Sequence, residues 1–238
     1  MAQALIIDIE TIGEKWEDID PLSQENLSSW IKKESKNETE LEFGMDSLRE
    51  GLGFSPLTGR IVAVGMMDYP TSKRAVYYQN PDTKEKEKVE DGVKYVAYTE
   101  AEMLNRFWEA VAKYQTVVTF NGYAFDVPYL IVRSAVHGIR PTANLMINRY
   151  LSSQYKATVQ HVDLQDQLSF YGAMRKKGSL HMWTRAFGIK SPKTAEVNGH
   201  AVATMYDEGR YLDIARYNAA DLVATGELYT KWTQFMKF

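Results

Sequence analysis

The chain has 238 residues and a formal net charge of −3, with 45% hydrophobic and 25% charged residues, a composition typical of a globular protein. It contains no cysteine, which excludes disulfides and thiolate zinc sites, and its four histidines form no ligand-spaced pair. A bound metal would therefore be a hard cation held by oxygen. The weakly negative net charge argues against a broad basic surface that binds nucleic acid. It does not exclude a nuclease, because divalent cations bound by a cluster of acidic residues reverse the sign of the electrostatic potential there.

The first residues predict no export or membrane insertion. The segment 1–10 has no basic flank, and acidic residues interrupt its apolar run, so it does not resemble a signal peptide. No apolar stretch approaches the length of a membrane span. We expect a cytoplasmic protein without a membrane partner.

The first hundred residues predict three strands and one excursion. Residues 5–9, 60–67 and 75–79 are short apolar runs typical of buried strands. Residues 13–59 are polar and charge-rich, and we expect a helical insertion there, with Trp16, Trp30 and Phe43 as anchors. Residues 80–94 alternate in charge sign after a turn signal, which favours a solvated loop.

The remainder alternates helices with strands. Thr99 and Glu102 form a capping box before a helix, and residues 115–120 are a β-branched run typical of a strand buried on both faces. Helices are expected at 125–136, 180–187 and 211–232, with a strand at 158–162. This order predicts an α/β fold, a mixed central sheet flanked by helices, in a single domain spanning residues 1–238.

Three carboxylate motifs stand out. Asp8 and Glu10 project from the same face of the first strand, because side chains alternate along a strand. If these carboxylates are buried, they need cations or solvent to compensate their charge. The alternative to a functional role is that the strand simply ends at the surface, where both acids meet water. Asp126 follows the strand at 115–120, where α/β folds place functional groups, although this motif taken alone is better explained by an aspartate that caps its helix or lies at the positive end of the helix dipole.

The third motif lies on the last helix. Tyr217 and Asp221 are four residues apart and share one helix face. That face points inward, because it continues through apolar positions. An inward aspartate requires a partner, and a salt bridge and a metal ion are equally open alternatives. The apolar positions on this face are Ile214, Ala224 or Thr225, and Leu228.

Taken together, these motifs carry a family resemblance. The order D-x-E, N-x-x-x-F-D and Y-x-x-x-D resembles the DEDD superfamily of 3′-5′ exonucleases, in its tyrosine branch. The histidine branch would have histidine at position 216, where this chain has arginine. The short sequences Val-Thr-Phe-Asn-Gly at 118–122 and His-Val-Asp-Leu at 161–164 are similar to sequences in the group related to the proofreading domain of family B DNA polymerases. The resemblance implies a ribonuclease H-like exonuclease fold.

The resemblance also implies a two-metal mechanism of phosphodiester hydrolysis. Asp8, Glu10 and Asp221 would hold one metal, Asp8 would bridge to a second, and Asp126 would support the second. Mg²⁺ suits these ligands, and Mn²⁺ should substitute for it. Tyr217 would position the attacking water rather than act as a strong base, because a phenol titrates near 10.

The same resemblance suggests the substrate contacts. Thr11 would contact the terminal 3′-hydroxyl, and Asn121 and Phe125 would shape the nucleotide pocket, although Phe125 could instead fill the core. Lys190 and Lys193 could contact phosphates from a surface loop. Asp163 would cap the helix that follows it and would not be a fifth ligand.

Substrate and partners stay open. Single-stranded DNA is favoured by the polymerase-like phrases, but a 3′-5′ exoribonuclease would carry similar carboxylates. A non-catalytic nucleic-acid-binding protein on the same fold is disfavoured, because every expected acid and the tyrosine are present. The insertion at 13–59 could dock a polymerase or another replication partner.

Overall fold

A mixed seven-stranded sheet forms the centre of the molecule in the computed structural model, which describes residues 3–81, 86–190 and 201–237. The strand order is β4-β5-β3-β2-β1-β6-β7. β1 pairs antiparallel with β2 and parallel with β6, so it lies in the interior of the sheet. The strands are β1 Ala4–Gly13, β2 Gly59–Tyr69, β3 Lys73–Tyr78, β4 Glu87–Glu90, β5 Val93–Ala97, β6 Thr116–Thr119 and β7 Gln160–Asp163.

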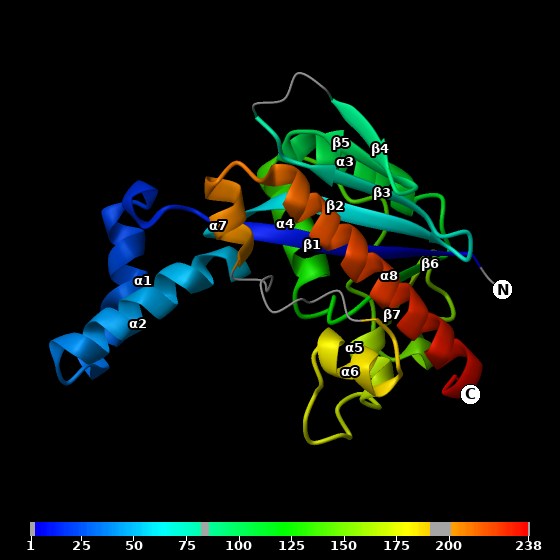
Figure 1. The fold of residues 1–238 in the computed structure, drawn as a ribbon. Coiled ribbons are helices and arrows are strands. Elements are labelled where there is room, and N and C mark those ends of the chain that lie inside the picture. The colour runs from blue at the N-terminus through cyan, green and yellow to red at the C-terminus, as the bar shows by residue number, and fades with distance from the viewer. Residues whose placement is uncertain (1–2, 82–85, 191–200, 238) are drawn as a thin grey trace.

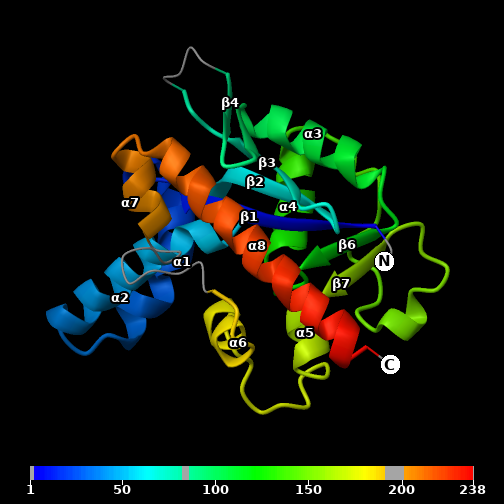
Figure 2. The same cartoon turned by 45° about the vertical axis from the view of Figure 1, so that its right-hand side comes forward.

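Helices cover both faces of the sheet, as Figures 1 and 2 show. α3 and α4 pack on one face, and α5, α6, α7 and α8 contribute to the core on the other. The predicted α/β architecture with a mixed central sheet is confirmed. The helices are α1 Pro21–Glu34, α2 Glu38–Gly51, α3 Glu100–Val111, α4 Asp126–Val136, α5 Leu164–Leu168, α6 Leu180–Ala186, α7 Ala201–Asp207 and α8 Tyr211–Phe235, with 3-10 turns η1 Trp16–Asp18, η2 Leu52–Phe54 and η3 Leu151–Ser153.

β1 divides its side chains between two cores, as its alternating pattern predicts. Leu5, Ile7 and Ile9 belong to the core under α3 and α4. Ala4 and Ile6 belong to the core under α8. Asp8 and Glu10 therefore emerge on the α8 side of the sheet.

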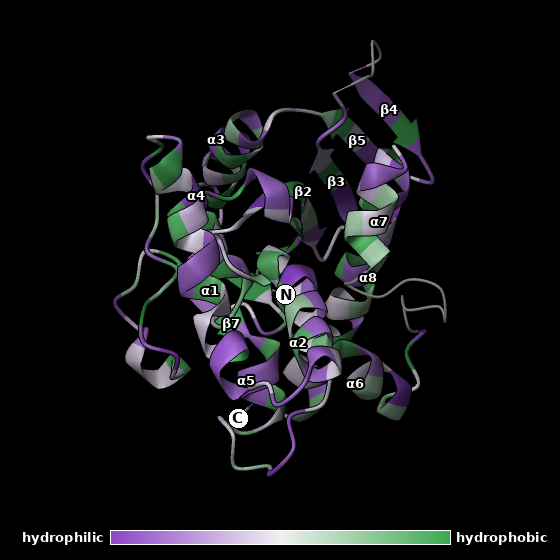
Figure 3. Cartoon of the chain, turned by 90° about the vertical axis from the view of Figure 1, so that its left-hand side faces the viewer, coloured by the Kyte–Doolittle hydropathy of each residue, from purple (hydrophilic) through white to green (hydrophobic). Residues whose placement is uncertain are grey.

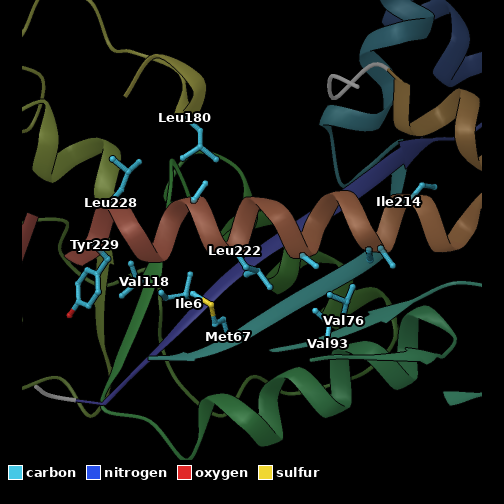
Figure 4. Packing of buried hydrophobic residues seen from close by; sticks show 14 of the residues in the cluster. Ile6, Met67, Val76, Val93, Val118, Leu180, Ile214, Leu222, Leu228 and Tyr229 are labelled. Carbon is cyan, nitrogen blue, oxygen red and sulfur yellow. The ribbon is translucent and has the colours of Figure 1, made fainter. Parts of the chain in front are cut away.

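α8 crosses the sheet diagonally and supplies much of the core on its side. In Figure 4, Ile214, Leu222 and Leu228 of this helix accompany Ile6 and Met67 of the sheet. The predicted inward face is confirmed, because Ile214, Ala224, Thr225 and Leu228 are all buried. Among the described helices, α8 included, none is both long and apolar enough to cross a membrane.

The segment between β1 and β2 is helical, as expected, and its two α-helices, α1 and α2, extend away from the sheet (Figure 1). Figure 3 faces this side and shows hydrophilic and hydrophobic residues mixed along both helices. The expectation that Trp30 and Phe43 anchor the segment is wrong, because they are 60% and 76% exposed. The helices contact each other through a few positions, with Ile31 buried against Gly44.

The predicted loop at 80–94 is also corrected. Glu87–Glu90 forms β4, and β5 begins at Val93, so the segment contains one strand and the start of another. The turn between them is Asp91-Gly92, with φ of 49° and 72°. Both angles are positive, as a tight hairpin turn requires, and Asp-Gly is a strong sequence signal for it. The alternating charges belong to an exposed strand at the sheet edge, where charged residues discourage further pairing.

Candidate active site

Three carboxylates from two distant segments meet on the α8 side of the sheet. Oxygen atoms of Asp8 and Glu10 from β1 and of Asp221 from α8 all lie within 4.8 Å of one another. Glu10 and Asp221 are each only 7% exposed, so the alternative of a strand that simply ends in water does not hold. A compact set of carboxylate oxygens is the donor set that hard divalent cations prefer, and these residues could hold a metal ion.

Two glycines allow α8 to approach the sheet closely enough to bring Asp221 there. Gly65 is paired with Asp8 across β1 and β2, and a Cβ at Gly65 would lie 1.9 Å from the Oδ1 of Asn218. A Cβ at Gly226 would lie 2.4 Å from a methyl carbon of Met67. Each glycine therefore removes a side chain that the contact between helix and sheet has no room for.

Asn218 binds one of the three carboxylates directly. Its Nδ2 donates a hydrogen bond to Oδ2 of Asp8, at 2.7 Å, and the residue is fully buried. Its Oδ1, pressed against Gly65, has no hydrogen-bond partner. Sequence reasoning missed this residue. The available signal was that Asn218 lies three residues before Asp221 and therefore on the same side of the helix.

Tyr217 lies beside the carboxylates and is half-buried. Burial raises the pKa of its phenol well above the ordinary value of 10.0, and the negative charges of Asp221, Glu10 and Asp8 raise it further. The phenol therefore keeps its proton at neutral pH and acts as a hydrogen-bond donor. It is a poor general base in this environment.

Asp126 approaches the site from the first turn of α4. Its Oδ1 accepts a hydrogen bond from the backbone N–H of Ile9, at 3.2 Å, so it is tied to the residue between Asp8 and Glu10. It is not one of the three carboxylates grouped within 4.8 Å. Burial, with added repulsion from Asp163 and Asp221, raises its pKa to about 7. Asp126 does not cap α4, whose start has no side-chain cap, but it lies in the first turn of the helix, near the positive end of the helix dipole, as the other alternative expects.

Asp163 organises the loop that carries Asn121. Its carboxylate accepts hydrogen bonds from the backbone N–H groups of Asn121 at 2.9 Å and Tyr123 at 3.0 Å. It also accepts one from Gln165 at 2.9 Å, and this confirms the predicted cap of α5. Asn121 has a left-handed backbone with φ of 66°, which asparagine tolerates better than most residues. Asp163 is buried, and burial raises its pKa.

A cleft of about 750 Å³ opens beside Glu10, between β1, η2, α7 and the start of α4. Thr11 and Phe125 line it, as does Phe54 of η2. The hydroxyl of Thr11 donates to the backbone oxygen of Gly53, at 2.7 Å.

The other expected substrate contacts lie elsewhere or outside the described residues. The side chains of Asn121 and Lys190 are not among the described residues that line this cleft. Lys190 is exposed, and Lys193 lies outside the described residues.

Comparison with known proteins agrees with this geometry. A family of predicted 3′-5′ exonucleases related to the exonuclease domain of PolB matches residues 61–237, about three quarters of the chain. The chain belongs to this family. The matched range contains Asp126, Tyr217 and Asp221, whereas Asp8 and Glu10 lie before it and are joined to them by the fold.

Curated relatives are DNA polymerases of archaea and yeast. The chain is 26% identical over 145 residues to DNA polymerase 1 of Saccharolobus solfataricus and 28% identical over 147 residues to a DNA polymerase of Pyrococcus glycovorans. It is 26% identical over 142 residues to the catalytic polypeptide of DNA polymerase epsilon of Schizosaccharomyces pombe. Each match covers 56% of this chain but only 16%, 18% and 6% of the respective polymerase.

A solved structure shows the same fold. The family B DNA polymerase of Pyrobaculum calidifontis superposes with a TM-score of 0.61 at 17% identity, over 99% of this chain and 25% of the polymerase. The predicted ribonuclease H-like fold and the resemblance to a family B exonuclease domain are thereby confirmed.

Proposed function

We propose that the chain is a metal-dependent 3′-5′ exonuclease that hydrolyses phosphodiester bonds from the 3′ end of single-stranded DNA. The observation that carries the proposal is the meeting of Asp8, Glu10 and Asp221 within 4.8 Å, in a chain of an exonuclease family. Three acids gathered in this way disfavour the alternative of a non-catalytic binding module, which has no use for a costly buried cluster of like charges.

The donor set suits Mg²⁺, with Mn²⁺ as a substitute, in a two-ion arrangement. Asp8, Glu10 and Asp221 would hold one ion, Asp8 would be shared with a second, and Asp126 would support that second ion. Bound ions would supply charge stabilisation to the leaving 3′-oxygen and lower the pKa of water.

The chain's own residues would position the reactants. Tyr217, kept protonated by burial and by the neighbouring acids, would donate a hydrogen bond that orients the attacking water. Asn218 would hold Asp8 in one rotamer through its hydrogen bond. We assign Tyr217 a positioning role, since a phenol with a raised pKa is a weak acceptor of protons.

DNA is the proposed substrate because the three curated relatives are DNA polymerases. Thr11, Asn121, Phe125, Lys190 and Lys193 remain proposed substrate contacts, as does cytoplasmic location. A polymerase or other replication partner for α1 and α2 also remains a proposal. The exposure of Trp30 and Phe43 on these helices favours it.

The test is a digestion of matched DNA and RNA oligonucleotides of one sequence, each labelled at the 5′ end, with Mg²⁺. A ladder that shortens from the 3′ end of DNA faster than of RNA supports the proposal. Faster digestion of RNA would instead identify an exoribonuclease.

A further inference from the structure

We propose that a basic and aromatic surface at the β7 edge of the sheet, separate from the carboxylate site, binds single-stranded DNA behind the end that is cleaved. The inference rests on the proposed exonuclease function. The surface, called the basic face below, is built by residues 149–156, between α4 and β7, and residues 170–177, between α5 and α6. Its basic residues are Arg149, Lys156, Arg175, Lys176 and Lys177, and its exposed aromatic residues are Tyr150, Tyr155 and Phe170.

Charge is distributed unevenly along the chain, and the net charge of −3 conceals this. Residues 138–190, all of which the structure describes, contain eight lysines and arginines, every one exposed. The two acidic residues of this stretch, Asp163 and Asp166, are buried. Of the five basic side chains of the face, only Arg149 forms an ion pair within the described part of the chain, and it remains 44% exposed. Such a surface attracts a polyanion, and its cations can contact phosphates without first losing a carboxylate partner.

Aromatic rings are interleaved with these cations. Tyr155 is 73% exposed, Phe170 54% and Tyr150 49%. The ammonium of Lys156 lies 5.3 Å from the centre of the ring of Tyr155. Bases of a single strand stack on exposed rings whatever their identity, because every base has a π face. Rings and cations together therefore fit a single strand better than a duplex, whose bases are already stacked.

The second loop holds Phe170 at the surface in an unfavourable backbone conformation. Phe170 and Tyr171 have φ of 52° and 56°, in the left-handed region that residues with a Cβ rarely adopt. The backbone N–H of Tyr171 donates to the backbone oxygen of Asp166, at 2.6 Å, and that of Phe170 donates to Gln167, at 3.3 Å. Strained backbone of this kind is concentrated at functional sites, which favours a binding role for the exposed ring.

The two loops form one connected surface. The ring centroids of Tyr150 and Tyr171 are 4.6 Å apart, and the hydroxyl of Tyr171 accepts a hydrogen bond from the backbone N–H of Leu151, at 3.3 Å. Gln165 donates to the backbone oxygen of Gly178, at 3.0 Å, and so ties the end of the second loop to α5. In Figures 1 and 2 this loop extends away from the sheet.

The basic face begins next to the loop that carries Asp126. The hydroxyl of Tyr123, in that loop, donates to the backbone oxygen of Asn148, at 3.3 Å, and accepts a hydrogen bond from Nε2 of Gln154, at 3.1 Å. The backbone N–H of Tyr123 donates to Asp163, at the end of β7. The segment 148–154 is therefore joined to the loop that leads to the candidate site.

The charges on the two sides of the site favour this direction for the strand. The cleft beside Glu10, at the end of β1, is lined by more acidic than basic side chains and would repel phosphates. The basic face lies at β7, two strands further along the sheet. Both α5 and α6 pack on the α8 side, where Asp8 and Glu10 emerge. A strand whose end lies at the carboxylates would therefore continue over the basic face.

The experiment measures binding of 5′-labelled single-stranded DNA of about 4 and about 20 nucleotides in EDTA over a range of salt concentrations, and kcat/KM on both with Mg²⁺. The neutral variant of the basic face is Arg175→Gln, Lys176→Gln and Lys177→Gln. A charge-retaining variant is Arg175→Lys, Lys176→Arg and Lys177→Arg. The matched control removes the same charge from exposed positions in and just after α1, by Lys32→Gln, Lys33→Gln and Lys36→Gln.

The neutral variant should bind the long strand more weakly and with a shallower salt dependence. The slope of log K against log salt should fall in magnitude by about 2, because each phosphate contact of a single strand contributes about 0.7. Between about 50 and 200 mM salt, wild type should therefore lose about 15-fold more affinity than the variant. Its kcat/KM on the long strand should fall with the affinity, whereas values for the short strand should change less than about twofold, because that strand does not reach the face. The charge-retaining variant and the control should match wild type.

Tyr155→Ala should lower affinity for the long strand about 5-fold or more, and Tyr155→Phe should retain it, as base stacking requires. Unchanged affinity and slope in the neutral variant, equal losses on both strand lengths, or an equal loss in the control would overturn the inference. So would a neutral variant that keeps DNA binding and instead loses self-association or binding to anionic vesicles. If wild-type protein cleaves neither DNA nor RNA, the proposed function fails, and the binding measurements in EDTA still decide on the basic face.

Discussion

The amide of Asn218 donates a hydrogen bond to the carboxylate of Asp8, at 2.7 Å, and joins the last helix directly to the first strand inside the carboxylate cluster. Asn218 is fully buried, and Gly65 leaves the space that it occupies. A partner behind a carboxylate fixes the direction in which its remaining lone pairs point. The relationship makes Asn218 part of the candidate site.

Asn218→Ala should therefore weaken the site without unfolding the protein. Loss of such a supporting bond typically costs about 10- to 100-fold in metal affinity or activity. The measurement is the rate of DNA digestion as a function of Mg²⁺ concentration, and the midpoint should move to higher concentration. Glu227→Ala, an exposed change on the same helix, should leave the curve in place. An unmoved midpoint for Asn218→Ala would show that Asp8 needs no such support.

Tyr217→Phe should lower kcat while keeping the shape of the pH profile. The phenol stays protonated throughout the neutral range, because burial and the adjacent acids raise its pKa. Removing its hydroxyl removes a donor but no group that titrates between about pH 6 and 9. The profile of kcat against pH for both proteins checks this. A limb of the profile that disappears in the variant would identify Tyr217 as a titrating base.

Asp126 should make the metal-free fold less stable as the pH rises. Its pKa is raised from an ordinary 3.8 to about 7, so between these values the folded state keeps a proton that the unfolded chain releases. Unfolding therefore becomes more favourable as the pH increases through this window, and the effect levels off above about pH 7.

Asp126→Asn should remove this contribution. In EDTA, the melting temperature of the variant should exceed that of wild type by more at pH 8 than at pH 5. A difference in melting temperature that is the same at both pH values would mean that Asp126 titrates normally in the fold.

The exposed aromatic residues of the insertion should be dispensable for stability. Trp30→Ala and Phe43→Ala should each change the free energy of unfolding by no more than about 0.5 kcal/mol, as surface substitutions do. Phe107→Ala, at a fully buried ring, should cost about 3–5 kcal/mol. Denaturant titration measures all three. A loss above about 2 kcal/mol at Trp30 or Phe43 would mean that the ring packs against the protein in solution.

The sequence was sufficient for the features set by local pattern. Alternation along residues 5–10 predicted which side chains of β1 face each core, and the spacing of Tyr217 and Asp221 predicted the inward face of α8. The three motifs, read in order, led to the family that the comparison confirms. These features depend on the periodicity of apolar residues and on short spacings between residues, and both can be read directly from the sequence.

Features that depend on distant contacts could not be predicted in this way. The bond from Asn218 to Asp8 joins residues 210 positions apart. The turn η2 lines the cleft, where the distant Thr11 and Tyr129 both donate hydrogen bonds to the backbone oxygen of Gly53. The β4–β5 hairpin was not predicted, because the charged residues of an exposed edge strand resemble those of a loop. The dipeptide Asp91-Gly92 was nevertheless a sequence signal for its turn. The seven-residue helix α7 is too short to show a clear period, and the five-residue α5 was predicted only through its cap at Asp163.

The most direct test of the account is digestion of a 5′-labelled single-stranded DNA oligonucleotide by purified protein with Mg²⁺. It is run beside an EDTA control and an Asp8→Asn, Asp221→Asn double variant that keeps the shape of both side chains. We predict a ladder that shortens from the 3′ end with wild-type protein and is absent from both controls. DNA and RNA left intact with Mg²⁺ and with Mn²⁺, or equal digestion by the double variant, would contradict the proposed function.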